Sequence, residues 1–172
     1  MLVQGLVQGF DAARRSGAER ETHAVALGQT IHANVIGHGR RTSAEPRFAP
    51  PEELGLESLA FEGEIYMLLL YATERAIRRQ ANSAGIQEAF WTAHRKQQQE
   101  DTLYLIFTSK TDARRMLYDY AISRNKVNPA RGIGPAFAQA NGFPQDMRLA
   151  AIGQTVFDGC LKAVRGALRQ SR

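Results

Sequence analysis

The feature that most constrains the fold is a run of eight consecutive apolar residues, 65–72, inside the longer segment 59–79. Eight residues are far fewer than the roughly 18 to 20 needed to cross a bilayer. The apolar side chains form two stripes at helical spacing, one through Phe61 and Leu68 and another through Tyr66 and Ile77. Because a helix that is apolar on two sides must be covered on two sides, this segment predicts the central helix of a bundle. The helix-start signal at 51–53 predicts where it begins, and we expect it to run to about residue 84, where Ser83–Gly85 ends it.

Length and composition limit the class of protein. A chain of 172 residues is enough for one domain with a hydrophobic core, or for one domain with an additional arm. Its apolar content of 44% and charged content of 23% are typical of soluble globular proteins. Cys160 is the only cysteine, so an internal disulfide framework is excluded and a reducing, cytoplasmic location is expected. The first ten residues lack the basic region of a signal peptide.

The N-terminal 15 residues predict a short amphipathic helix. Val3, Leu6, Val7 and Phe10 share one face, but an isolated helix of this length is marginal in water. The apolar face therefore predicts docking, either on the body of the protein, on a protein partner or second copy of the chain, or on a membrane surface. We expect these four residues to bind a partner, which makes the chain a candidate homo-oligomer or assembly subunit.

A second helix is predicted over 18–36, followed by a segment without helical periodicity. Residues 38–55 contain Pro46, Pro50 and Pro51, which forbid a continuous helix. We predict a boundary here, with an N-terminal helical arm and the start of the linker in 1–45. Residues 46–172 then form a bundle domain with a basic C-terminal region.

The rest of the chain also indicates helices. Segment 102–108 is rich in β-forming residues, but because no second strand is predicted we expect a helix there, with a strand as the alternative. The next helix, to about residue 125, is expected to turn Tyr120 inward. Segment 125–144, with three prolines and three glycines, predicts a loop with room for a single helical turn. The sequence thus predicts an all-α bundle of about five to six helices, with an N-terminal helical arm and a Pro/Gly-rich loop before the last helix.

No residue pattern in the chain indicates a catalytic, cofactor or metal site. The four histidines lack the helical spacing with glutamate that di-metal bundles use, so surface or capping positions are expected for all of them. Cys160 lies on the apolar stripe of the last helix, which predicts a buried small hydrophobe. The Gly-x-Gly at 132–134 follows no strand and lacks a third glycine. We therefore expect a protein that is not an enzyme.

Positive charge is concentrated in the C-terminal part of the chain. Residues 65–172 hold 16 of the 22 Lys and Arg side chains and 8 of the 17 acidic ones. The arginines at 75, 78 and 79 share a helix face, and those at 114 and 115 form a second group. Both groups predict solvated faces paired with acids, with i,i+4 pairs expected for Glu74–Arg78 and Arg115–Asp119. The candidate contacts for an anion or nucleic acid are Arg124, Lys126 and Arg131 in the loop and Lys162, Arg165 and Arg169 on the last helix.

These observations support two functions. The first is a non-enzymatic helical interaction protein, which acts as a subunit, scaffold or regulator within a larger protein assembly. The alternative is an accessory DNA- or RNA-binding protein that uses its basic C-terminal surface without sequence specificity. The arrangement of the basic side chains discriminates between them, because a continuous positive face favours nucleic acid and acid-paired arginines favour a protein partner.

Overall fold

The computed structural model describes residues 17–36, 49–80, 83–100 and 110–170. Within these ranges the chain forms six α-helices and one 3₁₀ turn and contains no strand, which confirms the all-α prediction. The elements are α2 (Gly17–Val35), η1 (Glu52–Leu54), α3 (Ser58–Arg78), α4 (Ser83–Glu100), α6 (Thr111–Arg124), α7 (Pro129–Ala140) and α8 (Met147–Gln170).

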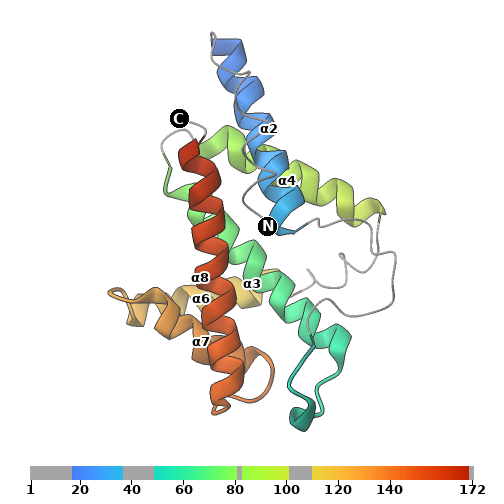
Figure 1. The fold of residues 1–172 in the computed structure, drawn as a ribbon, viewed down its shortest axis with the longest axis vertical. Coiled ribbons are helices and arrows are strands. Elements are labelled where there is room, and N and C mark those ends of the chain that lie inside the picture. The colour runs from blue at the N-terminus through green and yellow to red at the C-terminus, as the bar shows by residue number, and fades with distance from the viewer. Residues whose placement is uncertain (1–16, 37–48, 81–82, 101–109, 171–172) are drawn as a thin grey trace.

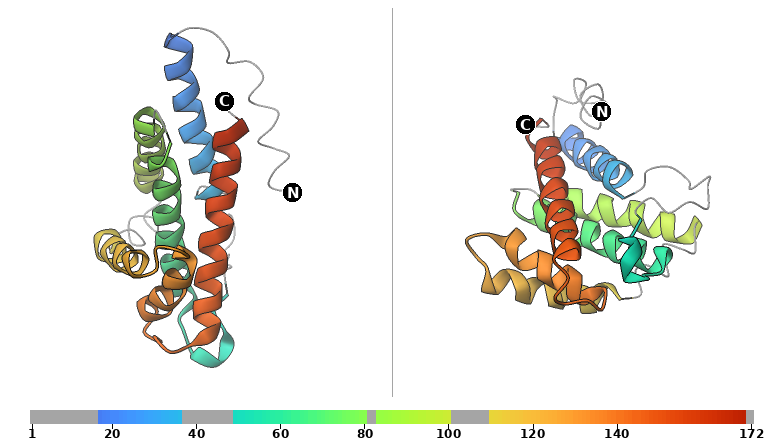
Figure 2. Two further views of the ribbon diagram at one scale, coloured as in Figure 1. Left: turned by 90° about the vertical axis from the view of Figure 1, so that its left-hand side faces the viewer. Right: turned by 60° about the horizontal axis from the view of Figure 1, so that its bottom comes forward.

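The two longest helices, α3 and α8, cross at the centre of the molecule (Figure 1). Helices α2 and α4 pack together at one end, while α6 and α7 pack together at the other (Figures 1 and 2). Fifteen residues of α3 are buried, which confirms that this segment is the central helix. Within the apolar run 65–72 only Leu69 is partly exposed.

The ends of α3 differ from the predicted ones. The side chain of Glu57 caps the helix, because its carboxylate accepts the backbone N–H groups of Leu59 at 2.9 Å and Ala60 at 2.7 Å. The helix-start signal at 51–53 forms the separate turn η1 instead. At the other end α3 stops at Arg78, and the Ser83–Gly85 segment that was expected to terminate it begins α4.

The predicted Pro/Gly-rich loop before the last helix is wrong, because residues 129–140 form the helix α7. Pro129 occupies the first turn, where its missing N–H costs nothing, and Asn128 caps the helix by accepting the N–H of Arg131. The glycines serve close packing: a Cβ at Gly134 would lie 2.6 Å from the carbonyl oxygen of Ala150 on α8. Tertiary contacts thus override the weak helix propensity of the segment.

Helix α2 confirms the predicted second helix and packs on α4. A Cβ at Gly28 would lie 2.5 Å from the carbonyl oxygen of Ile86, so the two backbones approach closely at this point. Leu27 and Ile31 of α2 belong to the hydrophobic core. The N-terminal arm residues Val3, Leu6, Val7 and Phe10, the boundary expected near residue 45, and segment 102–108 all lie outside the described residues, so those expectations stay predictions.

Two of the four histidines are not at the surface, contrary to the sequence prediction. His32 of α2 and His94 of α4 are buried, with ring centroids 5.6 Å apart. Aromatic rings of Phe90 and Trp91 pack on them, at centroid distances of 5.5 Å for each of the pairs His32–Phe90 and Trp91–His94. The Nε2 atoms of both rings have no hydrogen-bond partner in the described part of the chain. The Nδ1 atom of His94 lies 3.5 Å from the hydroxyl of Tyr66, and both imidazoles pack as aromatic rings in the α2–α4 core.

Candidate anion-binding site

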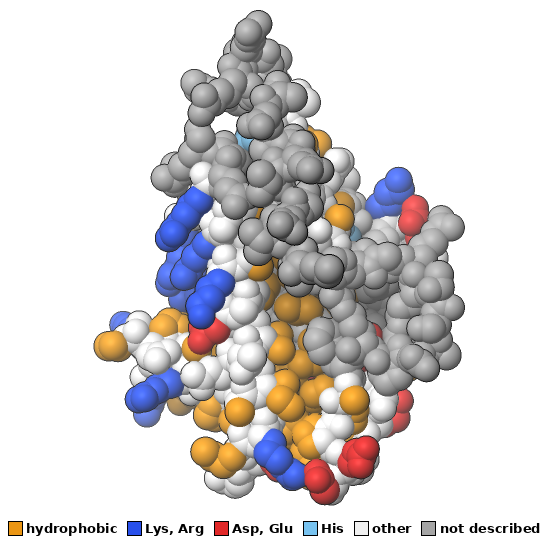
Figure 3. Space-filling model, viewed as in Figure 1, with side chains coloured by type: hydrophobic (Ala, Val, Ile, Leu, Met, Phe, Trp, Pro, Cys, Tyr) orange, Lys and Arg blue, Asp and Glu red, His pale blue; other side chains and the backbone are white. Residues whose placement is uncertain are grey.

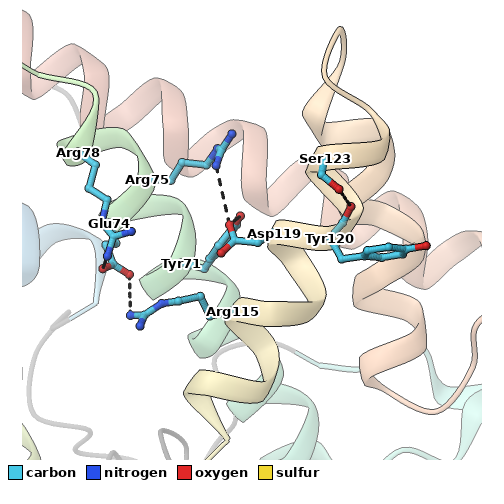
Figure 4. A network of polar contacts seen from close by, with 8 residues as sticks. All are labelled: Tyr71, Glu74, Arg75, Arg78, Arg115, Asp119, Tyr120 and Ser123. Carbon is cyan, nitrogen blue, oxygen red and sulfur yellow. Dashed lines mark hydrogen bonds and ion pairs between the residues drawn. The ribbon is translucent and has the colours of Figure 1, made fainter.

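The C-terminal turns of α3 and the facing side of α6 line an open pocket of about 110 Å³. Figure 4 shows most of its side chains. Two helices supply all of its lining. The lining residues are Tyr71, Glu74, Arg75, Arg78 and Arg79 of α3 and Arg115 and Asp119 of α6. We call this cavity the arginine pocket.

Helical spacing explains why these residues share one cavity. Arg75, Arg78 and Arg79 stand at i, i+3 and i+4 on α3, and Arg115 and Asp119 stand at i and i+4 on α6, so each helix presents one face. The pocket has a buried floor, since Tyr71 and Glu74 are 7% and 6% exposed. Arg78 and Arg79 are exposed at its rim.

Glu74 holds two of the arginines from opposite sides (Figure 4). Its Oε1 accepts a hydrogen bond from Nη2 of Arg78 at 2.5 Å, and its Oε2 accepts one from Nη2 of Arg115 at 2.8 Å. The predicted i,i+4 pair of Glu74 with Arg78 is confirmed. Because this carboxylate is buried and both of its oxygens are used, Arg78 and Arg115 are fixed as walls of the pocket.

Asp119 forms the opposite wall. Its Oδ1 accepts the hydroxyl of Tyr71 at 2.6 Å and lies 4.0 Å from Nη1 of Arg75. Burial and the hydrogen bond to Asp119 raise the pKa of Tyr71, so its hydroxyl is a neutral donor at physiological pH. The distance of 4.0 Å is beyond hydrogen-bond range, which leaves the guanidinium donors of Arg75 available.

The pocket carries an excess of positive charge. Within the lining four arginines face two carboxylates, which gives a net charge of +2, and the exposed Asp112 pairs with Arg115 at 3.6 Å from outside the lining. Arg79 has no ion-pair partner among the described residues, and the guanidinium of Arg75 interacts with Tyr71 and lies 4.0 Å from Asp119. A pocket with unused guanidinium donors and surplus positive charge is suited to an oxyanion such as phosphate or carboxylate.

The sequence-predicted anion contacts lie in two separate places. Arg124 ends α6, Lys126 lies in the turn after it, and Arg131 is in the first turn of α7. Arg124 lies 6.0 Å from the ring centroid of Tyr120, a side chain that is 64% exposed and not inward as predicted. These cations sit at the tip formed by α6 and α7.

The second predicted group, Lys162, Arg165 and Arg169, lies on the C-terminal half of α8. Helix α7 packs on α8 near Ala150, so Lys162 stands about 18 Å further along the helix at 1.5 Å per residue. The structure therefore does not bring the two groups together. Figure 3 shows Lys and Arg side chains gathered beside the C-terminal half of α8 and a smaller group toward the turn between α6 and α7.

The α8 cations stand at the level of the arginine pocket along the molecule. Thr73 of α3 contacts Cys160 of α8, with Oγ1 and Sγ 3.4 Å apart, and the rings of Tyr71 and Phe157 stack with centroids 6.4 Å apart. The C-terminal turns of α3 are thus packed beside the C-terminal half of α8. Among the described residues, Lys162, Arg165 and Arg169 have no ion-pair partner.

Other chemistry has little support in the described ranges. There, no group of three or more His, Cys, Asp or Glu side chains is placed to hold a metal ion. Cys160 is buried as predicted, and burial raises the pKa of its thiol to about 11, which makes it a poor nucleophile at neutral pH. None of the described helices combines the length and apolar character needed to span a membrane.

Comparison with protein-family models, with curated proteins and with solved structures found no match for this chain. The candidate site therefore rests on the geometry of the arginine pocket alone.

Proposed function

We propose that this chain is a non-enzymatic helical protein that binds nucleic acid through the arginine pocket and the adjoining cations of α8. Arg78, Arg114 and Arg115 pair with carboxylates, and acid-paired arginines of this kind favour a protein partner. The observation that carries the proposal is a set of cations without an ion-pair partner among the described residues, namely Arg79 in the pocket and Lys162, Arg165 and Arg169 on α8. Arginine forks match phosphate geometry and are the side chains that proteins use most for phosphate contacts. Lys162, Arg165 and Arg169, at i, i+3 and i+7 on α8, add positive charge along the C-terminal half of that helix.

The binding is expected to be electrostatic and not sequence-specific. Contacts to phosphates position a protein on nucleic acid without reading base edges. The cations of this surface are arginines and one lysine, and no row of Asn and Gln accompanies them on the outer face of α8. Affinity should therefore depend steeply on salt and weakly on sequence.

A salt titration tests this proposal. Five phosphate contacts, from Arg75, Arg79 and the three α8 cations, give a slope of log K against log salt of about −4.5 on duplex DNA. The variant Arg75→Gln with Arg79→Gln should flatten that slope by about 2 units on two duplexes of unrelated sequence. A matched control is Arg95→Gln with Lys96→Gln, which removes the same charge from an exposed part of α4 outside the pocket.

Three results would count against the proposal. The first is an equally flattened salt dependence of affinity in the control and pocket variants, which would show that the effect depends on net charge and not on the pocket. A preference for one duplex above about a hundredfold would contradict non-specific binding. Absence of binding to either duplex at low salt would remove the nucleic-acid function altogether.

A second candidate function is that of an interaction protein within a larger protein assembly. An exposed apolar pair of residues on α6 favours it. Met116 and Tyr120 stand four residues apart, so they share a face, and are 74% and 64% exposed. Aromatic residues and methionine are enriched at protein interfaces. Light scattering of the parent and of Met116→Glu tests this role, because a smaller particle in the variant would indicate self-association through α6. Unchanged size would remove the pair as a self-association surface.

A further inference from the structure

We propose that the arginine pocket is a site for a terminal phosphate, that is, a phosphate monoester such as the phosphorylated end of a nucleic-acid strand. This inference rests on the proposed nucleic-acid function and adds to it, because an electrostatic surface alone does not distinguish a strand end from its interior. Three features of the pocket carry it: its net charge, its floor, and the donors that its own carboxylates leave unused.

Charge is the first feature. The four arginines, Glu74 and Asp119 give the lining a charge of +2, while Asp112, which pairs with Arg115 at 3.6 Å, is 95% exposed and screened by solvent. A phosphate monoester carries about −1.5 to −2 at neutral pH, whereas each internal phosphodiester carries −1. A monoester therefore neutralises the pocket, while a diester leaves about one positive charge uncompensated. The hydroxyl of Tyr71 contributes no charge, since it is a neutral donor to Asp119.

The shape of the pocket is the second feature. Tyr71 and Glu74 close its floor, and the exposed arginines stand at its mouth. A cavity of about 110 Å³ has room for one tetrahedral oxyanion. A terminal phosphate is bonded to one nucleotide, so it can reach the floor with a single strand segment leaving the pocket. An internal phosphate is bonded to nucleotides on both sides, so two strand segments must leave the pocket.

The distribution of donors is the third feature. Nη2 of Arg78 and Nη2 of Arg115 each donate a hydrogen bond to Glu74, so these two side chains are held in place without a ligand. Arg75 and Arg79, one helical turn apart, are left to bind the phosphate, each with a guanidinium able to donate two parallel hydrogen bonds. Asp119 lies against Arg75 and repels the incoming anion. The geometry thus indicates that Arg75 and Arg79 bind the phosphate and that the carboxylate of Asp119 weakens this binding.

The test compares two forms of one short single-stranded oligonucleotide, one with a 5′-phosphate and one with a 5′-hydroxyl, each labelled at the 3′ end. Fluorescence anisotropy should show binding about tenfold tighter for the phosphorylated form, as expected when hydrogen bonds to a charged group are gained. In Arg75→Gln with Arg79→Gln this preference should vanish, and in Arg95→Gln with Lys96→Gln it should persist. Asp119→Asn, which keeps an acceptor for Tyr71, should increase it.

A second arm identifies the source of the phosphate. Inorganic phosphate and a nucleoside 5′-monophosphate are titrated into the parent by calorimetry, with inorganic sulfate as an oxyanion of comparable size. Binding of both phosphates that is lost in the double pocket variant, without a strand-end preference, would support the site but assign it to a free phosphate compound. Circular dichroism melting of each variant shows whether it remains folded.

The outcomes separate this inference from the proposed function. If both oligonucleotides bind equally with a steep salt dependence, and free phosphate does not bind, the terminal-phosphate site is overturned while nucleic-acid binding stands. If the parent binds free phosphate but no oligonucleotide, the proposed function fails and the phosphate site survives. If sulfate binds as tightly as phosphate and the phosphorylated oligonucleotide binds no tighter than the hydroxyl form, the pocket is a general anion site and the inference is overturned.

Discussion

Arg114 of α6 donates two hydrogen bonds to Glu64 of α3, from Nε to Oε2 at 2.6 Å and from Nη2 to Oε1 at 2.5 Å. The same Nη2 donates to the carbonyl oxygen of Ala140 at the end of α7, at 3.1 Å. The side chains of Glu64 and Arg114 are 8% and 18% exposed. One guanidinium therefore ties three helices together at a largely buried point, next to the α3–α6 face that carries the arginine pocket.

Removing one partner of this ion pair should lower the free energy of unfolding. Glu64→Ala leaves the charge of Arg114 without its carboxylate, and we expect a loss of about 3 kcal/mol in the free energy of unfolding. Urea denaturation measures the loss. In the paired control, Glu64→Leu with Arg114→Met, the cost should fall below about 1 kcal/mol because no uncompensated charge remains. Equal losses in the single and double variants would show that packing, and not the ion pair, holds this point.

Neighbouring leucines of the central helix should differ in their contribution to stability. Leu68 is fully buried, whereas Leu69, in the same apolar run, is partly exposed. Leu68→Ala should cost about 2 to 5 kcal/mol, since it leaves a cavity in packed surroundings. Leu69→Ala should cost about 1 kcal/mol, because less apolar surface returns to water. Urea denaturation of both variants measures the difference, and equal costs would contradict the burial difference.

The sequence predicted the elements whose signals are local. The apolar run 65–72 indicated the central helix, and the i,i+4 spacing indicated the Glu74–Arg78 pair. The helix at 129–140 could not be predicted in this way, because glycine and proline lower helix propensity locally. What stabilises α7 is tertiary: Gly134 lets its backbone approach Ala150, and no pattern in the sequence reports that distance.

The candidate site was predictable only in part, for a similar reason. Spacing placed the three arginines of α3 on one face, and Glu74 and Asp119 are acid partners as expected. The faces are not solvated as predicted, because Glu74 is buried and Arg114 pairs with the buried Glu64 instead. However, the predicted pairing of Arg115 with Asp119 within α6 is replaced by pairings across helices, with Glu74 and Tyr71 respectively. These contacts join positions more than 40 residues apart in sequence, and nothing in one sequence specifies that α3 and α6 face each other.

Substituting glycine by alanine should have opposite effects at two helical positions. At Gly134 a Cβ would lie 2.6 Å from the backbone oxygen of Ala150, so the helices must separate, at a cost of about 1 to 3 kcal/mol. At Gly159 of α8 a Cβ would meet no atom within 4 Å, and alanine should stabilise the helix by about 0.5 to 1 kcal/mol. Thermal melting measures both, with each 1 kcal/mol shifting the midpoint by about 2 to 4 °C. A gain at Gly134 would show that α7 and α8 are not closely packed there.

The last prediction concerns pH and the two buried histidines. Burial lowers the pKa of His32 to about 4, and burial together with the charges of His32 and Arg95 lowers that of His94 to about 4. Both rings have a pKa near 6.5 in the unfolded chain. Between these values the unfolded state binds more protons, so stability is complete above about pH 6.5 and is lost as the pH falls toward 4.

Lowering the pH from 7 to 5 should therefore reduce the free energy of unfolding by about 2 kcal/mol for each ring. The measurement is urea denaturation across this range, which lies above the usual pKa values of Asp and Glu. In His32→Phe with His94→Phe, aromatic packing against Phe90 and Trp91 is kept but the titrating groups are gone, so the pH dependence should be much flatter. The remaining histidines, His23 and His38, are common to both proteins. An unchanged pH dependence in the variant would show that groups other than the α2–α4 pair cause the loss of stability in acid.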